Sequence, residues 1–292
     1  MRNKIKQALI KGSPRLYTQV SRAVAYCDYR AETRLIKGRS ANDSGPNSIL
    51  YFTYYRCGSQ VFKKVLQRLF RQQEKSLSWI DFEAYLMHRE PEKGNIEDRI
   101  GEFLPAFRKT GYFYGPHYHP VRELIGGSEI RSFCLLRDPR DVLVSHYYSL
   151  GFAHTVTNMK AVERRKEVAS MSVDEFVLHP HFLGEIKDRY RVYLDEFYQY
   201  GESERFFRYE DMTRNMGGFL AAFASSCQLD VSLEDIEKVC QGVITESVKE
   251  NKISHRRSGK WGQFRSKLEP ETLERLEEEL GDLLEPWRDL SS

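Results

Sequence analysis

Short, continuous apolar runs alternate along the chain with longer stretches in which apolar residues recur every three or four positions. The runs are typical of buried strands, and the longer stretches are typical of amphipathic helices. Four runs predict strands, within residues 48–54, 111–116, 133–136 and 205–209. Because helical stretches separate these runs, we expect an α/β fold in which helices cover both faces of a central parallel sheet, a three-layer α/β/α arrangement.

Helical spacing predicts the other elements. Helices are expected at residues 61–70, 171–200, 219–227, 233–240 and 270–284. A further helix is expected to begin near Met212, with Asp211 as its cap.

Two more stretches are predicted less directly. Residues 79–100 are expected to be mainly helical, with the side chains of Asp81, Glu83 and His88 in solvent. Residues 151–165 are irregular and polar, which predicts either a lid over a site or an ordinary surface loop.

The stretch from residue 131 to 150 contains the clearest candidate chemistry. After the apolar run, Asp138 suits an N-cap, Pro139 suits the first helical position, and Asp141 would complete an acidic capping box. Arg137 and Ser145 would then lie at a strand-to-helix junction, where helix amides and a guanidinium favour a phosphate. The alternative is a surface ion pair between Arg137 and Asp141.

A second candidate anion site follows the first predicted strand. In the loop at residues 55–60, Gly58 allows close approach of a ligand, Ser59 can cap the next helix, and Arg56 adds positive charge. The strand, loop and helix predict a P-loop-like fold, although the Walker pattern GxxxxGK[ST] is absent. The alternative is a structural turn.

Two histidines follow the second predicted strand. Residues at the ends of parallel strands face the ligand crevice of open α/β sheets, so His117 or His119 could act as a general base. A structural loop is one alternative. A metal pair is another, but the local sequence offers no third ligand.

A cationic, glycine-bearing loop precedes the last predicted helix. Gly259 and Gly262 suggest a backbone that wraps a ligand, and Arg257 and Lys260 make an anion the obvious candidate. The alternative is that these charges are solvated.

Length and composition limit the possible classes of protein. The chain has 292 residues and no evident linker, so we expect a single α/β domain at residues 41–292 after a basic helical extension at residues 1–40. The net charge of +3 argues against a nucleic-acid-binding protein but allows an anionic ligand.

The expected compartment follows from the cysteines and from the apolar runs. The five cysteines are widely spaced and form no CxxC pair, which argues against a disulfide framework or a zinc site and favours the cytoplasm. No apolar run approaches the length of a membrane span. Basic and apolar residues alternate within residues 1–30, which predicts either weak contact with an anionic membrane surface or a solvated helix packed on the domain.

Four segments, in this order, resemble the motifs of the sulfotransferases that use 3′-phosphoadenosine 5′-phosphosulfate (PAPS). TYYRCGSQ at residues 53–60 resembles the family motif TYPKSGTTW, and RDPRD at 137–141 with Ser145 resembles the second motif. Tyr209-Glu210-Asp211 is similar to the family's YED segment, and residues 257–264 are similar to the late RKGxxGDW motif. Ordered agreement of four motifs is far more specific than any single one.

The resemblance implies a role for each segment. It implies a 5′-phosphosulfate site formed by Arg56, Cys57, Gly58, Ser59 and Gln60. It implies contacts with the 3′-phosphate and adenine from Arg137, Ser145, Tyr209, Arg257, Ser258 and Gly259. The family's KTHLP segment corresponds best to residues 115–119, which makes His117 the catalytic base and His119 the competing assignment, while Arg56 stabilises the leaving oxygen in place of the more familiar lysine.

The sequence therefore predicts a metal-independent transfer of a sulfuryl group from PAPS, leaving 3′-phosphoadenosine 5′-phosphate (PAP). The acceptor would be a hydroxyl or amine of a small molecule or a carbohydrate. Two alternatives are a metal-dependent P-loop kinase and a PAPS-binding protein without activity. The sequence does not indicate which oligomeric state the protein adopts.

Overall fold

The computed structural model describes residues 29–39, 45–71, 77–89, 96–125, 130–153, 159–199, 205–247 and 261–290. The chain divides into two compact units. The first comprises Met1–Tyr51 and Leu77–Arg131, and the second comprises Phe52–Ser76 and Ser132–Ser292. We describe each unit by itself.

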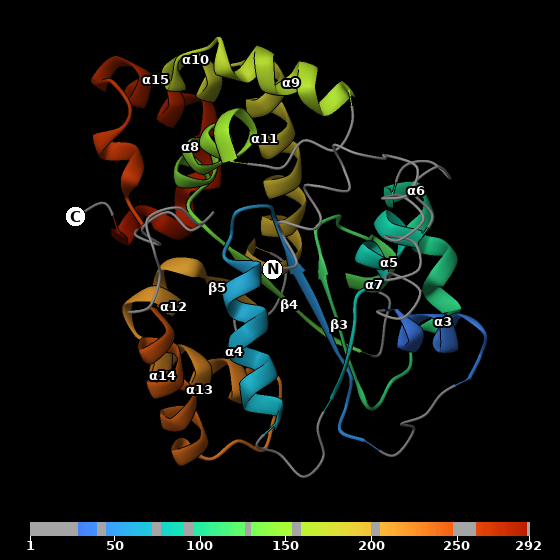
Figure 1. The fold of residues 1–292 in the computed structure, drawn as a ribbon. Helices are drawn as coiled ribbons and strands as arrows, with labels where there is room; N and C mark the ends of the chain where they lie inside the picture. Colours follow the sequence, from blue (N-terminus) through green and yellow to red (C-terminus); the bar gives the residue numbers. More distant parts are fainter. Residues whose placement is uncertain are drawn as a thin grey trace. The chain divides into compact units, whose positions relative to one another are not determined.

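Five strands form a sheet in the order β2-β3-β1-β4-β5 (Figure 1). They are β1 (Ile49–Thr53), β2 (Ser78–Ile80), β3 (Tyr112–His117), β4 (Arg131–Leu136) and β5 (Phe206–Arg208). The pairs β2 with β3 and β4 with β5 are parallel. These strands confirm the four predicted runs and the α/β class with a central parallel sheet.

Helices occupy most of the remaining described chain. The first unit contains α3 (Arg30–Ile36), α5 (Phe82–Arg89), α6 (Ile96–Ile100), η1 (Gly101–Ala106) and α7 (Arg122–Ile125). The second contains α4 (Ser59–Arg71), α8 (Pro139–Tyr148), η2 (Ser149–Ala153), α9 (Met159–Ala169), α10 (Val173–Val177), α11 (Pro180–Leu194), η3 (Asp195–Gln199), α12 (Tyr209–Arg214), α13 (Met216–Ser226), α14 (Leu233–Ser247), η5 (Gln263–Ser266), α15 (Pro270–Leu280) and η6 (Gly281–Leu290). The segments η2 and η3 are π-helical turns, and η1, η5 and η6 are 3-10 helices.

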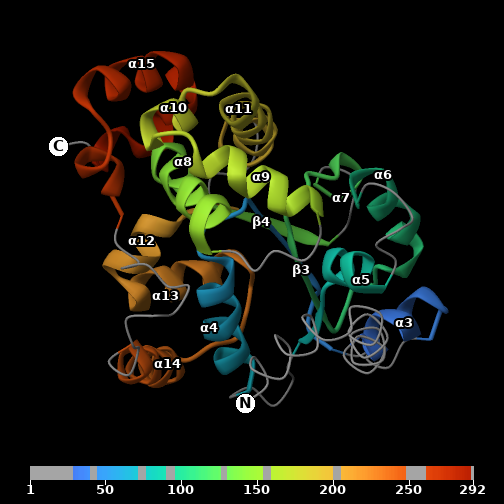
Figure 2. The same ribbon diagram turned by 45° about the horizontal axis from the view of Figure 1, so that its top comes forward.

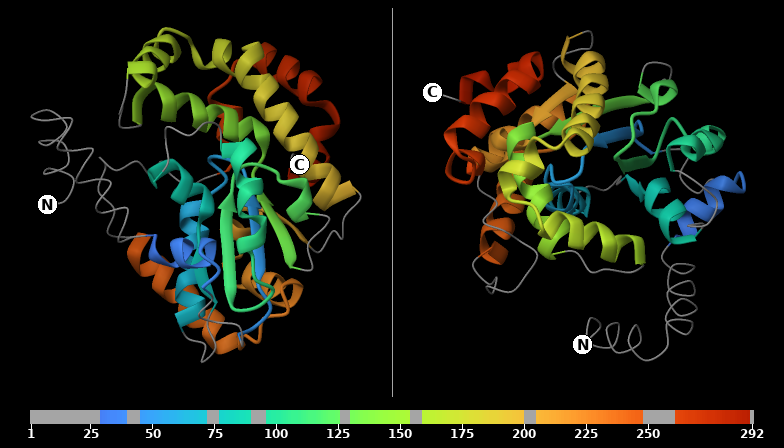
Figure 3. Two further views of the ribbon diagram at one scale, coloured as in Figure 1. Left: turned by 90° about the vertical axis from the view of Figure 1, so that its right-hand side faces the viewer. Right: turned by 90° about the horizontal axis from the view of Figure 1, so that it is seen from above.

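The side chains of β5 show how the second unit is layered. Phe207 packs against Phe223 of α13 with ring centroids 5.9 Å apart, and Phe223 in turn lies 5.4 Å from Phe62 of α4. Phe206 instead packs on Trp287 of η6, at 6.0 Å. Because successive strand residues point to opposite faces, α4 and α13 cover one face and the C-terminal segment covers the other. This segment contacts α11, and the two lie side by side in the left view of Figure 3.

The first unit places α5 against β3 (Figure 2). Tyr114 of β3 stacks on Phe82 of α5 with ring centroids 6.1 Å apart. The neighbouring Phe113 packs on Trp79 of β2 at 4.5 Å. The aromatic residues of β3 therefore fix the position of the first turn of α5.

The described part of residues 79–100 is mainly helical, as expected, through α5 and α6, although it begins with β2, a strand too short to show alternation. Three other expectations about the elements are wrong. Met159 to Arg165 are helical rather than irregular, since they belong to α9. Helix α12 begins at Tyr209, and Asp211 pairs with Arg208 at 2.7 Å instead of capping a later start. Helix α4 begins at Ser59 itself, so this serine is not its cap.

The predicted extension at residues 1–40 is described only from residue 29 to 39, where α3 forms. The proposed membrane contact of residues 1–30 lies almost wholly outside the described part. Within the ranges given above, no helix is long and apolar enough to cross a membrane. The division into an extension and a single domain stays a prediction.

Candidate functional site

The loop between β1 and α4 has the backbone of a tight anion loop. Arg56 and Gly58 both have positive φ angles, +69° and +81°. A side chain larger than hydrogen at Gly58 would collide with Tyr209, because a Cβ there would lie 2.5 Å from two atoms of the Tyr209 ring. The loop opens onto the first turn of α4, a helix of 13 residues whose N-terminal amides favour negative charge. Ser59 is buried here and Gln60 is exposed.

The junction between β4 and α8 forms as predicted at its first residues. The Asp138 side chain caps α8 by accepting a hydrogen bond from the Arg140 amide at 2.9 Å, and Pro139 is the first helical residue. The Arg137 guanidinium donates to Asp141 at 3.0 Å and is almost fully buried. Despite its burial, the pKa of Arg137 is raised, mainly by the charge of Asp141.

Asp141 has a further role that the sequence did not indicate. Its carboxylate accepts hydrogen bonds from the amides of Gly262 at 2.7 Å and Phe264 at 3.1 Å. Gly262 allows this approach with a positive φ of +73°. Asp141 therefore joins the junction to the last residues of the predicted late motif.

The structure brings the first two motifs into direct contact. Arg56 Nε donates to Ser145 Oγ at 3.1 Å, although 89 residues separate them. The Arg137 guanidinium carbon lies 4.8 Å from the centre of the Tyr209 ring, and this ring also covers Gly58. Five residues predicted from three separate motifs thus form one cluster in the second unit.

Tyr190 of α11 contacts both loops, and it was not identified as a site residue from the sequence. Its hydroxyl donates to the Arg137 carbonyl oxygen at 2.6 Å and lies 3.6 Å from Cys57 Sγ. Burial raises the pKa of the Cys57 thiol to about 11. Cys57 is therefore a neutral packing and hydrogen-bonding group rather than a nucleophile.

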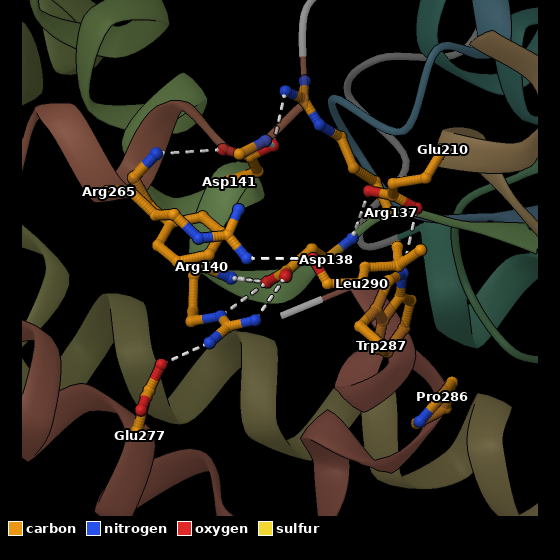
Figure 4. Close-up of polar contacts among 12 residues, drawn as sticks. Arg137, Asp138, Arg140, Asp141, Glu210, Arg265, Glu277, Pro286, Trp287 and Leu290 are labelled. Atoms are coloured by element: carbon orange, nitrogen blue, oxygen red, sulfur yellow. Dashed lines mark hydrogen bonds and ion pairs between the residues drawn. The ribbon is translucent and has the colours of Figure 1, made fainter. Parts of the chain in front are cut away.

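A network of charges, all buried except Glu277, lies beside this cluster (Figure 4). Arg140 forms ion pairs with Asp138, at 2.7 Å, and with Glu277 of α15. Glu210 accepts hydrogen bonds from the Asp138 amide at 3.0 Å and from Trp287 Nε1 at 2.9 Å. Burial raises the pKa of Glu210 to about 7. These contacts attach the junction to the C-terminal helices.

The two candidate histidines lie at and just beyond the end of β3, in the first unit. His117 is fully buried, and the side chain of His119 is 11% exposed. Glu83, which was expected in solvent, is buried and accepts a hydrogen bond from His119 Nδ1 at 3.0 Å. The expectation failed because the partners of Glu83 are 35 and 36 residues away in the sequence. The one sequence feature that indicated the burial of Glu83 was its position between Phe82 and Leu86, on the buried side of a short helix.

Other predicted residues lie outside the described part. These are Arg257, Ser258, Gly259 and Lys260. Trp261, which follows them, packs under the Arg214 guanidinium at 4.4 Å. Among the residues that the structure does describe, no three histidine, cysteine or acidic side chains are grouped as metal ligands.

The groups of the second-unit cluster suit an anion with several phosphate oxygens. Two guanidinium groups, two serine hydroxyls and the amides at the start of α4 can all donate hydrogen bonds to such an anion. The carboxylate of Asp141 is already engaged by Arg137 and two amides. The donor set therefore fits PAPS or PAP.

A family model described as a sulfotransferase domain matches residues 46–287. The chain belongs to the sulfotransferase family. Mouse sulfotransferase SULT7A1, solved in complex with PAP, has a similar fold, with a TM-score of 0.54 at 13% identity over 89% of this chain and 91% of that chain. Retinol dehydratase in complex with retinol and PAP gives a TM-score of 0.44 at 17% identity, over 82% of each chain. Among curated proteins, none matches this sulfotransferase in sequence.

Proposed function

We propose that the protein transfers a sulfuryl group from PAPS to a hydroxyl or amine of a small-molecule or carbohydrate acceptor. The observation that carries this proposal is the contact between Arg56 and Ser145, because it joins the 5′-phosphosulfate and 3′-phosphate motifs in one donor-rich cluster. We also propose the cytoplasm as the compartment, from the number and spacing of the cysteines.

Different residues would bind the two ends of PAPS. Arg56, Ser59 and Gln60, with the backbone of Cys57 and Gly58, would hold the 5′-phosphosulfate. Arg137, Ser145, Arg257, Ser258 and Gly259 would hold the 3′-phosphate, and Tyr209 would lie by the adenine. Recognition of the 3′-phosphate would distinguish PAPS from nucleotides that lack it.

The chemistry then needs one proton transfer and no metal. The acceptor oxygen or nitrogen forms a bond to sulfur while the bond between sulfur and the bridging phosphate oxygen breaks, so that PAP leaves. Arg56 stabilises the charge that develops on the bridging oxygen. A histidine at the end of β3, His117 or His119, accepts the acceptor's proton.

Calorimetry with PAP, without added metal, tests the cofactor assignment. PAP should bind tightly, and adenosine 5′-phosphate should bind far more weakly, because it lacks the 3′-phosphate. Labelled PAPS should then label at least one member of a panel of phenols, alcohols, amines and oligosaccharides. Equal binding of the two nucleotides would contradict the proposal, and metal-dependent ATP consumption would favour a kinase. PAP binding without any transfer would favour a non-catalytic protein.

The variant Arg137→Ala tests one contact of the site. Losing a charge-assisted, bidentate contact should weaken PAP binding by about 1.5–3 kcal/mol, or roughly one to two decades in the dissociation constant. Arg191→Ala is the matched control, since this arginine is exposed and pairs with Asp282 on the surface. Unchanged PAP affinity in folded Arg137→Ala would remove Arg137 from the site.

A further inference from the structure

Glu83 occupies an unusual position for a glutamate. It lies in the first turn of α5 and is 1% exposed. Its Oε1 atom accepts hydrogen bonds from the amides of Tyr118, at 2.8 Å, and His119, at 3.2 Å. Its Oε2 atom lies 3.0 Å from His119 Nδ1. One carboxylate thus holds both the backbone and the ring of His119.

The protonation state of Glu83 determines the direction of the last hydrogen bond. Burial alone would raise the pKa of Glu83, but its interactions with His117 and His119 lower the pKa below its usual value. An ionised carboxylate only accepts hydrogen bonds, so Nδ1 of His119 must carry the proton. In the neutral ring, Nε2 then holds the lone pair that can accept a proton from a substrate.

The same geometry distinguishes the two histidines. His117 Nδ1 lies 3.8 Å from Glu83 Oε1, which is beyond ordinary hydrogen-bond distance. His119 Nδ1 is within that distance, and its backbone amide is fixed by the same glutamate. A base whose second nitrogen is hydrogen-bonded to a buried carboxylate is the usual arrangement of a positioned general base.

We propose that Glu83 is a positioning residue that holds His119 with Nδ1 protonated and Nε2 basic, and that His119 rather than His117 is the general base. This inference rests on the proposed sulfuryl transfer and assigns its proton. As the new bond to sulfur forms and the bond to the PAP oxygen breaks, the acceptor's proton moves to His119 Nε2. The resulting imidazolium is stabilised by the adjacent Glu83 carboxylate.

The variant Glu83→Gln separates positioning from packing, because it has nearly the same shape. The glutamine oxygen should stay on the side of the two backbone amides, which leaves its NH2 group facing His119 Nδ1. That group donates to Nδ1 and so favours the opposite tautomer, with the proton on Nε2. We expect kcat for the best acceptor of the panel to fall on the order of 100-fold. The dissociation constant of PAP should change by less than about twofold.

Two further comparisons complete the kinetic test. Glu102→Gln, the same change at an exposed glutamate of the first unit, should leave kcat unchanged. His119→Asn should lower kcat by about 10²–10⁴-fold. Adding Glu83→Gln to His119→Asn should then lower it by less than about threefold more, because the glutamate acts through the histidine. A larger loss in His117→Asn than in His119→Asn would overturn the assignment of the base.

Nitrogen NMR of protein labelled in its histidine rings reads the tautomer without any turnover. His119 should be protonated at Nδ1 in the wild-type protein and at Nε2 in Glu83→Gln at neutral pH. A wild-type ring protonated at Nε2 would overturn the positioning role of Glu83. If the wild-type protein neither binds PAP nor transfers from PAPS, the proposed function fails, and with it the catalytic half of the inference. The NMR spectrum then decides the positioning half alone.

Discussion

Gly58 shows how one residue constrains the loop between β1 and α4. It combines a left-handed backbone, with φ of +81°, with direct contact to the Tyr209 ring. Both features exclude a side chain, the first through backbone strain and the second through collision. The rigid Tyr209 ring therefore limits the position of the loop, and this position determines where the amides of α4 point.

We predict that Gly58→Ala weakens both folding and cofactor binding. Strain and collision together should lower the free energy of unfolding by about 2–4 kcal/mol and weaken PAP binding by at least about tenfold. Urea titration and calorimetry measure the two effects. Gly38→Ala is the matched control, because φ is also positive, at +70°, but a Cβ there meets nothing within 4 Å. Equal losses in both variants would mean that the contact with Tyr209 contributes nothing.

Glu210 gives a prediction about pH. Burial raises its pKa from about 4.5 to about 7, so between these values the folded protein keeps a proton that the unfolded chain has released. The contribution of Glu210 to the free energy of unfolding is fully present below pH 4.5. It falls by about 3 kcal/mol as the pH rises to about 7. Glu210→Gln should remove this slope. Chemical denaturation of both proteins from pH 4.5 to 8 measures it, and parallel curves would contradict the prediction.

The candidate site was predictable where local sequence determines its chemistry. Asp138 and Pro139 begin α8 as their residue types require, and Arg56 lies in the expected loop. Glu83 and Tyr190 were missed because their partners are remote backbone atoms, and no local pattern marks a side chain that will meet them. Sequence periodicity identifies a buried face, but it does not identify which polar residue on that face will find a partner.

At the scale of elements, those with a clear apolar pattern were predicted, including the three-residue β5, whereas β2 was not. Helices α4 and α15 follow from many repeats of apolar spacing, and β4 from a continuous apolar run. Strand β2 has three residues and depends on its pairing with β3. This pairing is a tertiary interaction, which the strand propensity of three residues does not predict.

Helix α11 contacts, through Tyr190, both of the loops that we propose bind the nucleotide, which gives a prediction at this scale. Tyr190→Phe removes the buried hydrogen bond to the Arg137 carbonyl and should lower the free energy of unfolding by about 1–2 kcal/mol. It should also weaken PAP binding severalfold, because the Arg137 backbone loses its support. Tyr147→Phe is the control, since its hydroxyl donates to Met171 at 2.9 Å, outside the loops. If both variants bind PAP like the wild-type protein, α11 does not position the site.

At the scale of the whole molecule, the described residues that we propose bind the cofactor all belong to the second unit, and the two histidines belong to the first. The C-terminal elements reinforce the second unit, because Glu277 and Trp287 hold Arg140 and Glu210 next to the junction. A ligand of this junction should therefore stabilise distant parts of the same unit.

We therefore predict that PAP protects the second unit selectively against hydrogen exchange. At 100 times its dissociation constant, PAP should stabilise the structure that binds it by about 2.7 kcal/mol, which slows exchange through openings that release the ligand by about 100-fold. The slowing should appear in peptides covering the β1–α4 loop, the start of α8 and α11. Peptides from β2 and α5 should change far less, because no residue there is assigned to the nucleotide. Adenosine 5′-phosphate at the same concentration is the control for binding without a 3′-phosphate. Protection centred on α5 instead would show that the nucleotide binds mainly to the first unit, contrary to the assignment of Arg56, Arg137 and Ser145.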